Sequence, residues 1–185
     1  MFLNLKHDFR RVYQKTSYRG WLRKVFIVFW SLGFQAIMGY RICRWLASKH
    51  IPLLGLFIQR SIEITTGISI PDEAEIGKGL MINHFGGIVI NVGSKIGDFC
   101  TISHGVTLGN KRPGGKSPAI GDNVFIAVGA KILGDITIGD NCIIGANAVV
   151  MDSVPPNSIV AGIPAKVVKT ISNKDEYKEF FYAQD

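Results

Sequence analysis

Two hydrophobic patterns divide the chain, and they meet near residue 63. Between residues 22 and about 62, apolar and aromatic side chains dominate in the manner of helices, with a break at Pro52. Gly20 and Gly33 are the positions where helix is least favoured in this stretch. We therefore expect a helical segment at the front of the chain.

Beyond this segment, an aliphatic residue returns at every sixth position. A two-residue slip after Ile88 and a longer gap after Leu108 interrupt the series. Neither the period of a helix nor the alternation of a single strand produces this pattern, whereas a repeating turn does. The repeat positions are Ile64, Ile70, Ile76, Ile82, Ile88, Ile90, Ile96, Ile102, Leu108, Ile120, Ile126, Ile132, Ile138, Ile144 and Val150.

Such a repeat is expected when three units, each a short strand and a corner, close a triangular coil of about 18 residues. The aliphatic residue fills the axis of the coil, and a smaller residue four positions later shares that core. Stacked coils pair their backbones at the strand spacing of about 4.8 Å. The second inward positions are Ala74, Cys100, Val106, Val124, Ala130, Ile136, Cys142 and Ala148.

The predicted fold is mainly β, a parallel β-helix with an N-terminal α-helical segment. We expect a helical, basic and apolar segment at 1–62, a β-helix at 63–168 and a C-terminal tail at 169–185. Glycines that follow the aliphatic residues, such as Gly97 and Gly121, are expected where the coils need space.

Positive charge is concentrated at the front of the chain. Residues 1–60 carry 11 Lys and Arg against Asp8 alone, a net +10, whereas residues 61–185 carry 10 against 13 Asp and Glu, a net −3. No nucleic-acid-binding motif accompanies the basic segment, so an anionic membrane surface or an acidic acceptor is the better candidate partner. Three cysteines without CxxC spacing or a signal peptide favour a reducing cytoplasm, with Cys100 and Cys142 as packing residues.

The uncharged stretch 25–40 has two interpretations. Its 16 residues fall short of the roughly 18 to 20 that span a bilayer. Flanking Arg, Lys, Trp and Tyr side chains suit a helix at a membrane interface, which would make the protein cytoplasmic and peripheral at the inner face of the cell membrane. Packing against the β-helix or a sister subunit explains the stretch as well, so both interpretations stay open.

Several motifs between residues 67 and 168 resemble the serine acetyltransferase branch of the hexapeptide-repeat acyltransferases. They occur in the family's order and cover just over half of the chain. The resemblance implies a left-handed β-helix, a homotrimer with active sites between subunits, and acetyl-CoA as co-substrate in a groove outside the coils. The motifs are GISIPDEAEIGKGLMINH (67–84), GIVI (87–90), HGVTLG (104–109), GAKILGDITIGDNCIIGANAVV (129–150), VPPNS (154–158) and AGIPAKVV (161–168).

His84 lies where the repeat slips, and a slip pushes a small loop out of a regular coil, a usual place for function. By resemblance, His84 is the general base that takes the acceptor hydroxyl's proton as its oxygen attacks the thioester, without an acyl-enzyme. A solvated loop histidine is the alternative interpretation. His104 holds the same place one coil later, so we expect the two imidazoles to be stacked about one coil rise apart. His104 is then either a pocket residue that donates to the oxyanion or an outlying histidine.

Three departures from serine acetyltransferases concern the acceptor. The family's Asp that orients the catalytic His falls on Ser69, and its serine-binding Asp falls on Asn83. Its Arg-His pair falls on Lys116 and Ser117. The lost carboxylates suit an ammonium group, so a sugar hydroxyl in surface-polysaccharide biosynthesis, free or lipid-linked, is the expected acceptor. L-Serine acetylation in cysteine biosynthesis is one alternative, and a non-catalytic scaffold at the membrane is another.

The resemblance also places the co-substrate. In the extended loop 109–118, Lys111, Arg112 and Lys116 are candidates for the phosphates of coenzyme A or for an anionic acceptor, with a solvated basic loop as the alternative. No metal is expected, because a site of three histidines needs more than His84 and His104, the histidines of the repeat region. By position in the family, coenzyme A contacts fall on Gly109, Asn110, Val128, Ala146 and Lys166.

Overall fold

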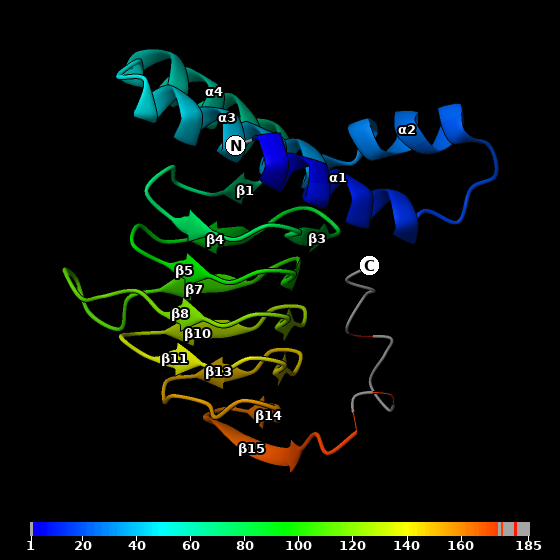
Figure 1. The fold of residues 1–185 in the computed structure, drawn as a ribbon. Coiled ribbons are helices and arrows are strands. Elements are labelled where there is room, and N and C mark those ends of the chain that lie inside the picture. The colour runs from blue at the N-terminus through cyan, green and yellow to red at the C-terminus, as the bar shows by residue number, and fades with distance from the viewer. Residues whose placement is uncertain (1, 174, 176–179, 181–185) are drawn as a thin grey trace.

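The computed structural model describes residues 2–173, 175 and 180. They form a column of stacked coils with a layer of helices across one end (Figure 1). The helices begin at Phe2, ahead of the apolar pattern at 22–62 and within the helical segment expected at 1–62. The helices are α1 (Phe2–Lys15), α2 (Trp21–Trp30), α3 (Leu32–Ser48) and α4 (Pro52–Thr66).

Three sheets form the sides of the column. Every pairing between the described strands is parallel except that of β14 with β15. Sheet A contains β1 (Ile68–Ser69), β4 (Ile88–Ile90), β7 (Thr107–Gly109), β10 (Lys131–Leu133) and β13 (Val149–Val150). Sheet B contains β2 (Glu75–Ile76), β5 (Lys95–Ile96), β8 (Ala119–Ile120) and β11 (Thr137–Ile138). Sheet C contains β3 (Met81–Asn83), β6 (Thr101–Ser103), β9 (Phe125–Ile126), β12 (Ile143–Ile144), β14 (Ser158–Gly162) and β15 (Ala165–Thr170).

The strand register shows where the regular coil is interrupted. Ile90 pairs with Leu108, 18 residues later. Ile68 pairs with Ile88, 20 residues later, so two extra residues lie in the loop that carries His84. Thr107 pairs with Lys131, 24 residues later, because the loop between β7 and β8 is longer. The predicted parallel β-helix with N-terminal helices is confirmed, and its two interruptions lie where the sequence places them.

The aliphatic repeat positions from Ile70 onward are buried along the axis, with exposed fractions of at most 7%. Ile64 does not belong to this series, because it lies in α4 and is 76% exposed. The prediction was wrong there because α4 continues to Thr66 and ends at Gly67, which adopts a left-handed conformation (φ 65°). The first coil therefore begins at Ile68.

Gly97 shows why the coils need small residues at their corners. A Cβ at this position would lie 2.3 Å from Oδ1 of Asp122 and 2.6 Å from the carbonyl carbon of Gly121 in the next coil. Asp122 Oδ1 accepts a hydrogen bond from the backbone N–H of Asp98 at 2.7 Å, so the carboxylate links two coils. The same arrangement occurs at Gly77.

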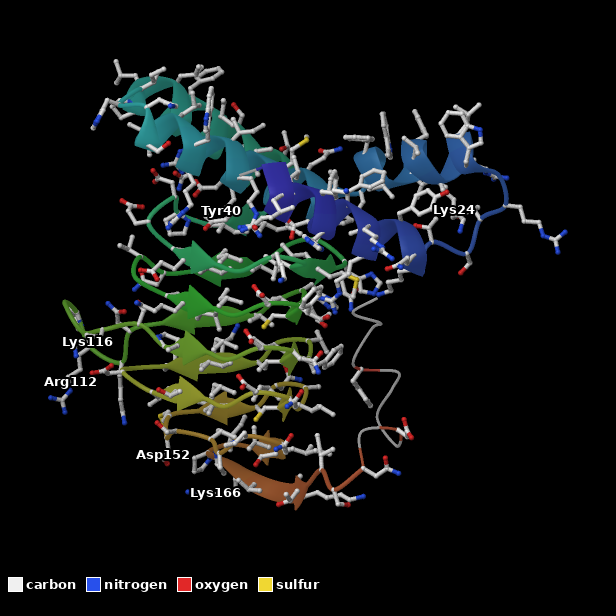
Figure 2. The ribbon with its side chains drawn as sticks, viewed as in Figure 1. Lys24, Tyr40, Arg112, Lys116, Asp152 and Lys166 are labelled. Atoms are coloured by element: carbon white, nitrogen blue, oxygen red, sulfur yellow. The ribbon has the colours of Figure 1, made fainter. Side chains whose placement is uncertain are left out.

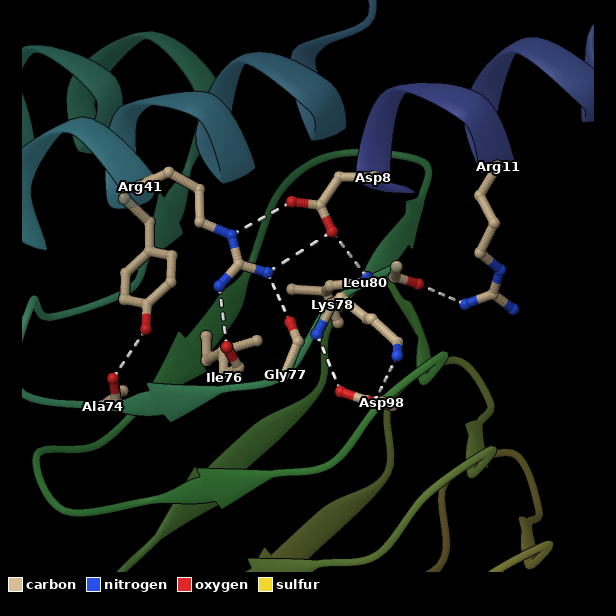
Figure 3. A network of polar contacts seen from close by, with 11 residues as sticks. Asp8, Arg11, Arg41, Ala74, Ile76, Gly77, Lys78, Leu80 and Asp98 are labelled. Carbon is tan, nitrogen blue, oxygen red and sulfur yellow. Dashed lines mark hydrogen bonds and ion pairs between the residues drawn. The ribbon is translucent and has the colours of Figure 1, made fainter. Parts of the chain in front are cut away.

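The helical layer supplies polar partners to the first coil (Figure 3). Arg41 of α3 donates to the carbonyl oxygens of Ile76, at 2.7 Å, and Gly77. Asp8 of α1 pairs with Arg41 at 3.0 Å and accepts a hydrogen bond from the N–H of Leu80 at 2.9 Å. Backbone groups at an open coil end need such partners when helices cover them. Further donors are Tyr40 to Ala74 O, Arg44 to Asp72 O, and Arg11 to Gly79 O.

The opposite end of the column is closed by the chain itself. β15 turns back and pairs antiparallel with β14, the last strand of sheet C to join in parallel. Thr170 is the last residue of β15. Most of the predicted tail at 169–185 lies outside the described residues.

Candidate active site

His84 stands at the corner where sheet C leads into sheet A, directly after β3. The residue is exposed, and its φ of 62° lies in the left-handed region that non-glycine residues seldom adopt. Gly86 and Gly87 also have positive φ and complete the loop. The slip in the repeat thus turns the imidazole out of the column.

His104 lies directly against His84 in the next coil. β3 and β6 pair with Asn83 opposite Ser103, so the residues that follow them share one corner. The ring centroids of His84 and His104 are 5.6 Å apart, and the ring planes meet at 88°. This is the stacked position that the twenty-residue spacing predicts. Two imidazoles therefore face one region of solvent.

The same corner continues along the column. The N–H of Gly129 donates to His104 O at 3.0 Å, and the N–H of Asn147 donates to Val128 O at 2.8 Å. Val128 and Ala146, two of the predicted coenzyme A contacts, accordingly follow His84 and His104 along one edge. A long ligand that begins at His84 would meet these two residues in turn.

The extended loop lies at a different corner, where sheet A leads into sheet B. Gly109 ends β7, and Asn110 Oδ1 accepts hydrogen bonds from Asn91 Nδ2 at 2.7 Å and Ser117 Oγ at 2.8 Å. Val92 O lies 2.7 Å from the same Ser117 Oγ, whose single proton serves one of these two acceptors at a time. One network therefore holds Asn110 and Ser117 beside Gly109.

The charged residues of this second corner reach into solvent. Arg112 and Lys116 project from the column (Figure 2). Lys116 Nζ lies 3.1 Å from Asp135 Oδ2, and both side chains of this pair are strongly exposed. Lys166 of β15 lies 3.9 Å from Asp152. Exposed pairs of this kind contribute at most about 1 kcal/mol, so a phosphate group could replace either carboxylate. Arg112 and Lys116 thus lie at a different corner of the chain from His84.

A cavity of about 700 Å³ opens beside His84. Its other wall is the bend between α2 and α3, which the sequence did not identify as part of a site. The signal was Gly33: a Cβ there would lie 2.7 Å from Ile82 O, so glycine lets α3 approach β3 closely. The lining residues are Trp30, Ser31, Leu32, Gly33, Gln35, His84 and Phe85.

The polar residues near the acceptor side have unexpected partners. Lys15 Nζ donates to Asn83 Oδ1 at 2.5 Å, which places a cation next to the residue that precedes His84. Ser69 Oγ donates to Glu63 Oε1 at 2.7 Å. Helices α1 and α4 therefore add a lysine and a carboxylate to positions that the sequence suggested were neutral.

Burial determines the chemistry of Cys100, one of the second inward positions of the coils. Burial raises the pKa of the Cys100 thiol to about 12, so Cys100 stays protonated and unreactive. Within residues 2–173, 175 and 180, no group of three His, Cys, Asp or Glu side chains could hold a metal ion.

Comparisons with known proteins identify relatives of the chain. Residues 117–151 match the family described as bacterial transferase hexapeptide (six repeats). A serine acetyltransferase of Synechococcus elongatus is 36% identical over 171 residues, which cover 91% of this chain and 69% of that protein. A serine acetyltransferase of Staphylococcus xylosus is 47% identical over 139 residues, or 74% of this chain and 64% of that protein.

Solved structures give the same result. Neisseria gonorrhoeae serine acetyltransferase in complex with serine has a TM-score of 0.82 at 35% identity, covering 91% of this chain and 69% of that one. Brucella abortus serine acetyltransferase in complex with coenzyme A has a TM-score of 0.81 at 31% identity, covering 92% and 68%. The chain thus spans about two thirds of these relatives. Their names agree with the serine alternative better than with the expected polysaccharide acceptor.

Proposed function

The chain belongs to the serine acetyltransferase family, whose members are acetyl-CoA-dependent O-acetyltransferases, and we propose that it transfers the acetyl group of acetyl-CoA to a hydroxyl acceptor. The observation that carries the proposal is the His84–His104 pair beside a cavity at the break in the repeat. A site of this kind combines a base with room for an acceptor.

In the proposed reaction, an imidazole nitrogen of His84 takes the proton of the acceptor hydroxyl. The hydroxyl oxygen attacks the thioester carbonyl carbon, the C–S bond breaks, and the thiolate of coenzyme A takes the proton back from the His84 imidazolium and leaves as the thiol. A positioned base of this type contributes about 10² to 10⁴-fold to the rate. The role of His104 remains a hypothesis: its ring is close enough to His84 to face the same reacting carbonyl.

We propose that the complete site forms between neighbouring chains of a homotrimer. His84, His104, Val128 and Ala146 lie at one corner of the coil, whereas Gly109, Asn110, Lys116 and Ser117 lie at another. Coenzyme A can contact both sets only if the second corner of one chain lies against the first corner of its neighbour. Backbone groups at the corners and the exposed cations fit an extended, phosphate-bearing ligand.

L-Serine is the first candidate acceptor, because relatives at 36% and 47% identity are named serine acetyltransferases. A sugar hydroxyl is the second, and one contact favours it. Lys15 at Asn83 puts a positive charge near His84, which would repel the ammonium group of serine and tolerate a neutral or anionic acceptor.

The test of the reaction is coenzyme A release by purified protein, with and without His84→Ala. We expect turnover to fall by about 10² to 10⁴-fold while thermal unfolding stays unchanged, because His84 is exposed. His50→Ala, at another exposed histidine with positive φ, is the matched control and should keep full activity. Equal release by the wild type and His84→Ala would leave only a scaffold role.

Separate kinetic assays with each acceptor distinguish the two candidates. Release is measured with L-serine and with nucleotide- or lipid-linked sugars, for the wild type and for Lys15→Met. If serine is the acceptor, kcat/KM for serine exceeds that for the sugars and rises when the lysine charge is removed. If a sugar is the acceptor, the order is reversed in the wild type.

A further inference from the structure

Helix α2 presents an apolar row to solvent. Trp21, Leu22, Phe26 and Trp30 have exposed fractions between 63% and 71%, whereas Val28 is the buried residue of this helix. The rings of Phe26 and Trp30 stack, with centroids 5.5 Å apart. Large apolar side chains gathered on one surface usually mark a site of association.

Helix α4 presents a second row of the same kind. Leu53, Leu56, Phe57 and Ile64 have exposed fractions between 61% and 80%. Gly55 is buried on the opposite side of α4 and lies near Cys43 of α3. Side chains of both α2 and α4 project from the side of the helical layer that faces away from the coils (Figure 2). We call these two rows together the outer apolar surface.

The charge around the outer apolar surface points to its partner. Residues 1–60 carry a net +10 and residues 61–185 a net −3. Arg11, Arg41, Arg44 and Arg60 serve internal contacts. Two cations of α2 lie against aromatic rings: Arg23 lies 4.9 Å from the ring centroid of Tyr18, and Lys24, on the side of α2 that faces α1 (Figure 2), lies 5.1 Å from that of Tyr13. Additional exposed cations of the segment are Arg19 and Lys49.

Aromatic and aliphatic side chains bordered by Arg and Lys suit the interface of a bilayer with anionic headgroups. Within the described residues, no single helix is long and apolar enough to cross a bilayer, and the pair α2 and α3, which together reach that length, bends by 69°. The geometry therefore suits helices that lie in the interface.

We propose that the outer apolar surface binds an anionic lipid bilayer and thereby places the cavity beside His84 at the membrane surface. Trp30 makes the connection, because it belongs to the exposed row of α2 and also lines the cavity. An acceptor carried on a lipid would reach His84 from the bilayer. This consequence for the acceptor rests on the proposed function, whereas membrane binding does not.

The experiment is vesicle flotation of the full chain with liposomes that contain about 30 mol% phosphatidylglycerol in phosphatidylcholine, compared with pure phosphatidylcholine. The variant carries Trp21→Ser and Phe26→Ser on α2 with Leu53→Ser and Phe57→Ser on α4. The matched control carries Ile163→Ser and Val168→Ser, which are 74% and 61% exposed near the other end of the column.

We expect the wild type and the matched control to float with anionic vesicles and the variant to lose at least about tenfold in partition coefficient. Raising the salt to about 0.5 M should weaken wild-type binding, because the headgroup attraction is screened. Wild-type protein that stays unbound, or a variant that binds as well as the control, would overturn the proposal.

Sedimentation velocity distinguishes a second copy as the occupant. If the substitutions split a larger assembly while the wild type ignores vesicles, the outer apolar surface is a protein interface and the membrane proposal fails. Coenzyme A release with a soluble acceptor tests the reaction separately. The variant should retain that activity, so lost vesicle binding and lost catalysis are distinguishable.

Discussion

The coils and the helical layer are stabilised in different ways. In the coils, each layer has an aliphatic residue at the axis and a backbone ladder to the next layer, and this arrangement is kept where the loops at His84 and at 109–118 change the spacing. The helical layer has no repeat, and its attachment depends on individual side chains such as Arg41, Asp8 and Tyr40. The difference teaches that stability is distributed in the column and concentrated at the junction.

Asp8→Ala should give the largest loss of stability. It removes the partner of Arg41, whose side chain is 4% exposed, and leaves a buried guanidinium without its counter-charge. Burial raises the pKa of Asp8 even though Arg41 and the N–H of Leu80 act to lower it, so the carboxylate depends on these partners. We expect the free energy of unfolding to fall by about 3 to 5 kcal/mol. Chemical denaturation of the purified protein measures this value.

Glu75→Ala provides the control for this substitution. It removes an ion pair with Lys95 in which both side chains are more than half exposed, so the loss should stay below about 1 kcal/mol. Equal losses for Asp8→Ala and Glu75→Ala would contradict the idea that the junction depends on the buried pair.

Ile132→Ala tests the column itself and should cost about 2 to 5 kcal/mol. Ile132 is fully buried at the axis, and a cavity there is closed in by the coils on both sides. Ile163→Ala, at a side chain that is 74% exposed, should change stability by less than about 0.5 kcal/mol. Thermal and denaturant unfolding of both variants measures the two losses. If Ile132→Ala left the free energy of unfolding unchanged, the assignment of Ile132 to the axis would be wrong.

The sequence predicted the column better than the layer, for a physical reason. The coil requires an aliphatic residue at every sixth position, so its geometry can be recognised in the sequence. The inward positions from Ile70 to Val150 and the stacking of His84 on His104 follow from this spacing alone. Ile64 is not an inward position of the coils. The six-residue spacing extended to it by chance, because it lies in α4, which ends at Gly67.

The contacts between the helical layer and the first coil do not follow any repeating sequence pattern. Glu63 accepts a hydrogen bond from Ser69, Lys15 donates one to Asn83, and Trp30 lines the cavity. The helical partners in these contacts, Glu63, Lys15 and Trp30, are not inward positions of the six-residue repeat that reveals the coils. Their positions depend on how α1, α2 and α4 pack against the first coil. Gly33 was a sign that the sequence contained, because a glycine within an apolar helix indicates a close approach as well as a position where helix is less favoured.

Cysteine labelling provides the finest test of the comparison, because each part of the molecule contains a buried thiol. Burial raises the pKa of Cys43 in α3 and of Cys142 in the coils, so both should react slowly with a thiol reagent at about pH 8 unless the protein opens locally. In Asp8→Ala, we expect Cys43 to be labelled at least about tenfold faster, as followed by mass spectrometry of its peptide, while Cys142 keeps its wild-type rate. If both thiols accelerate together, the helical layer and the column open as one cooperative unit, and the junction is not a separate point of weakness.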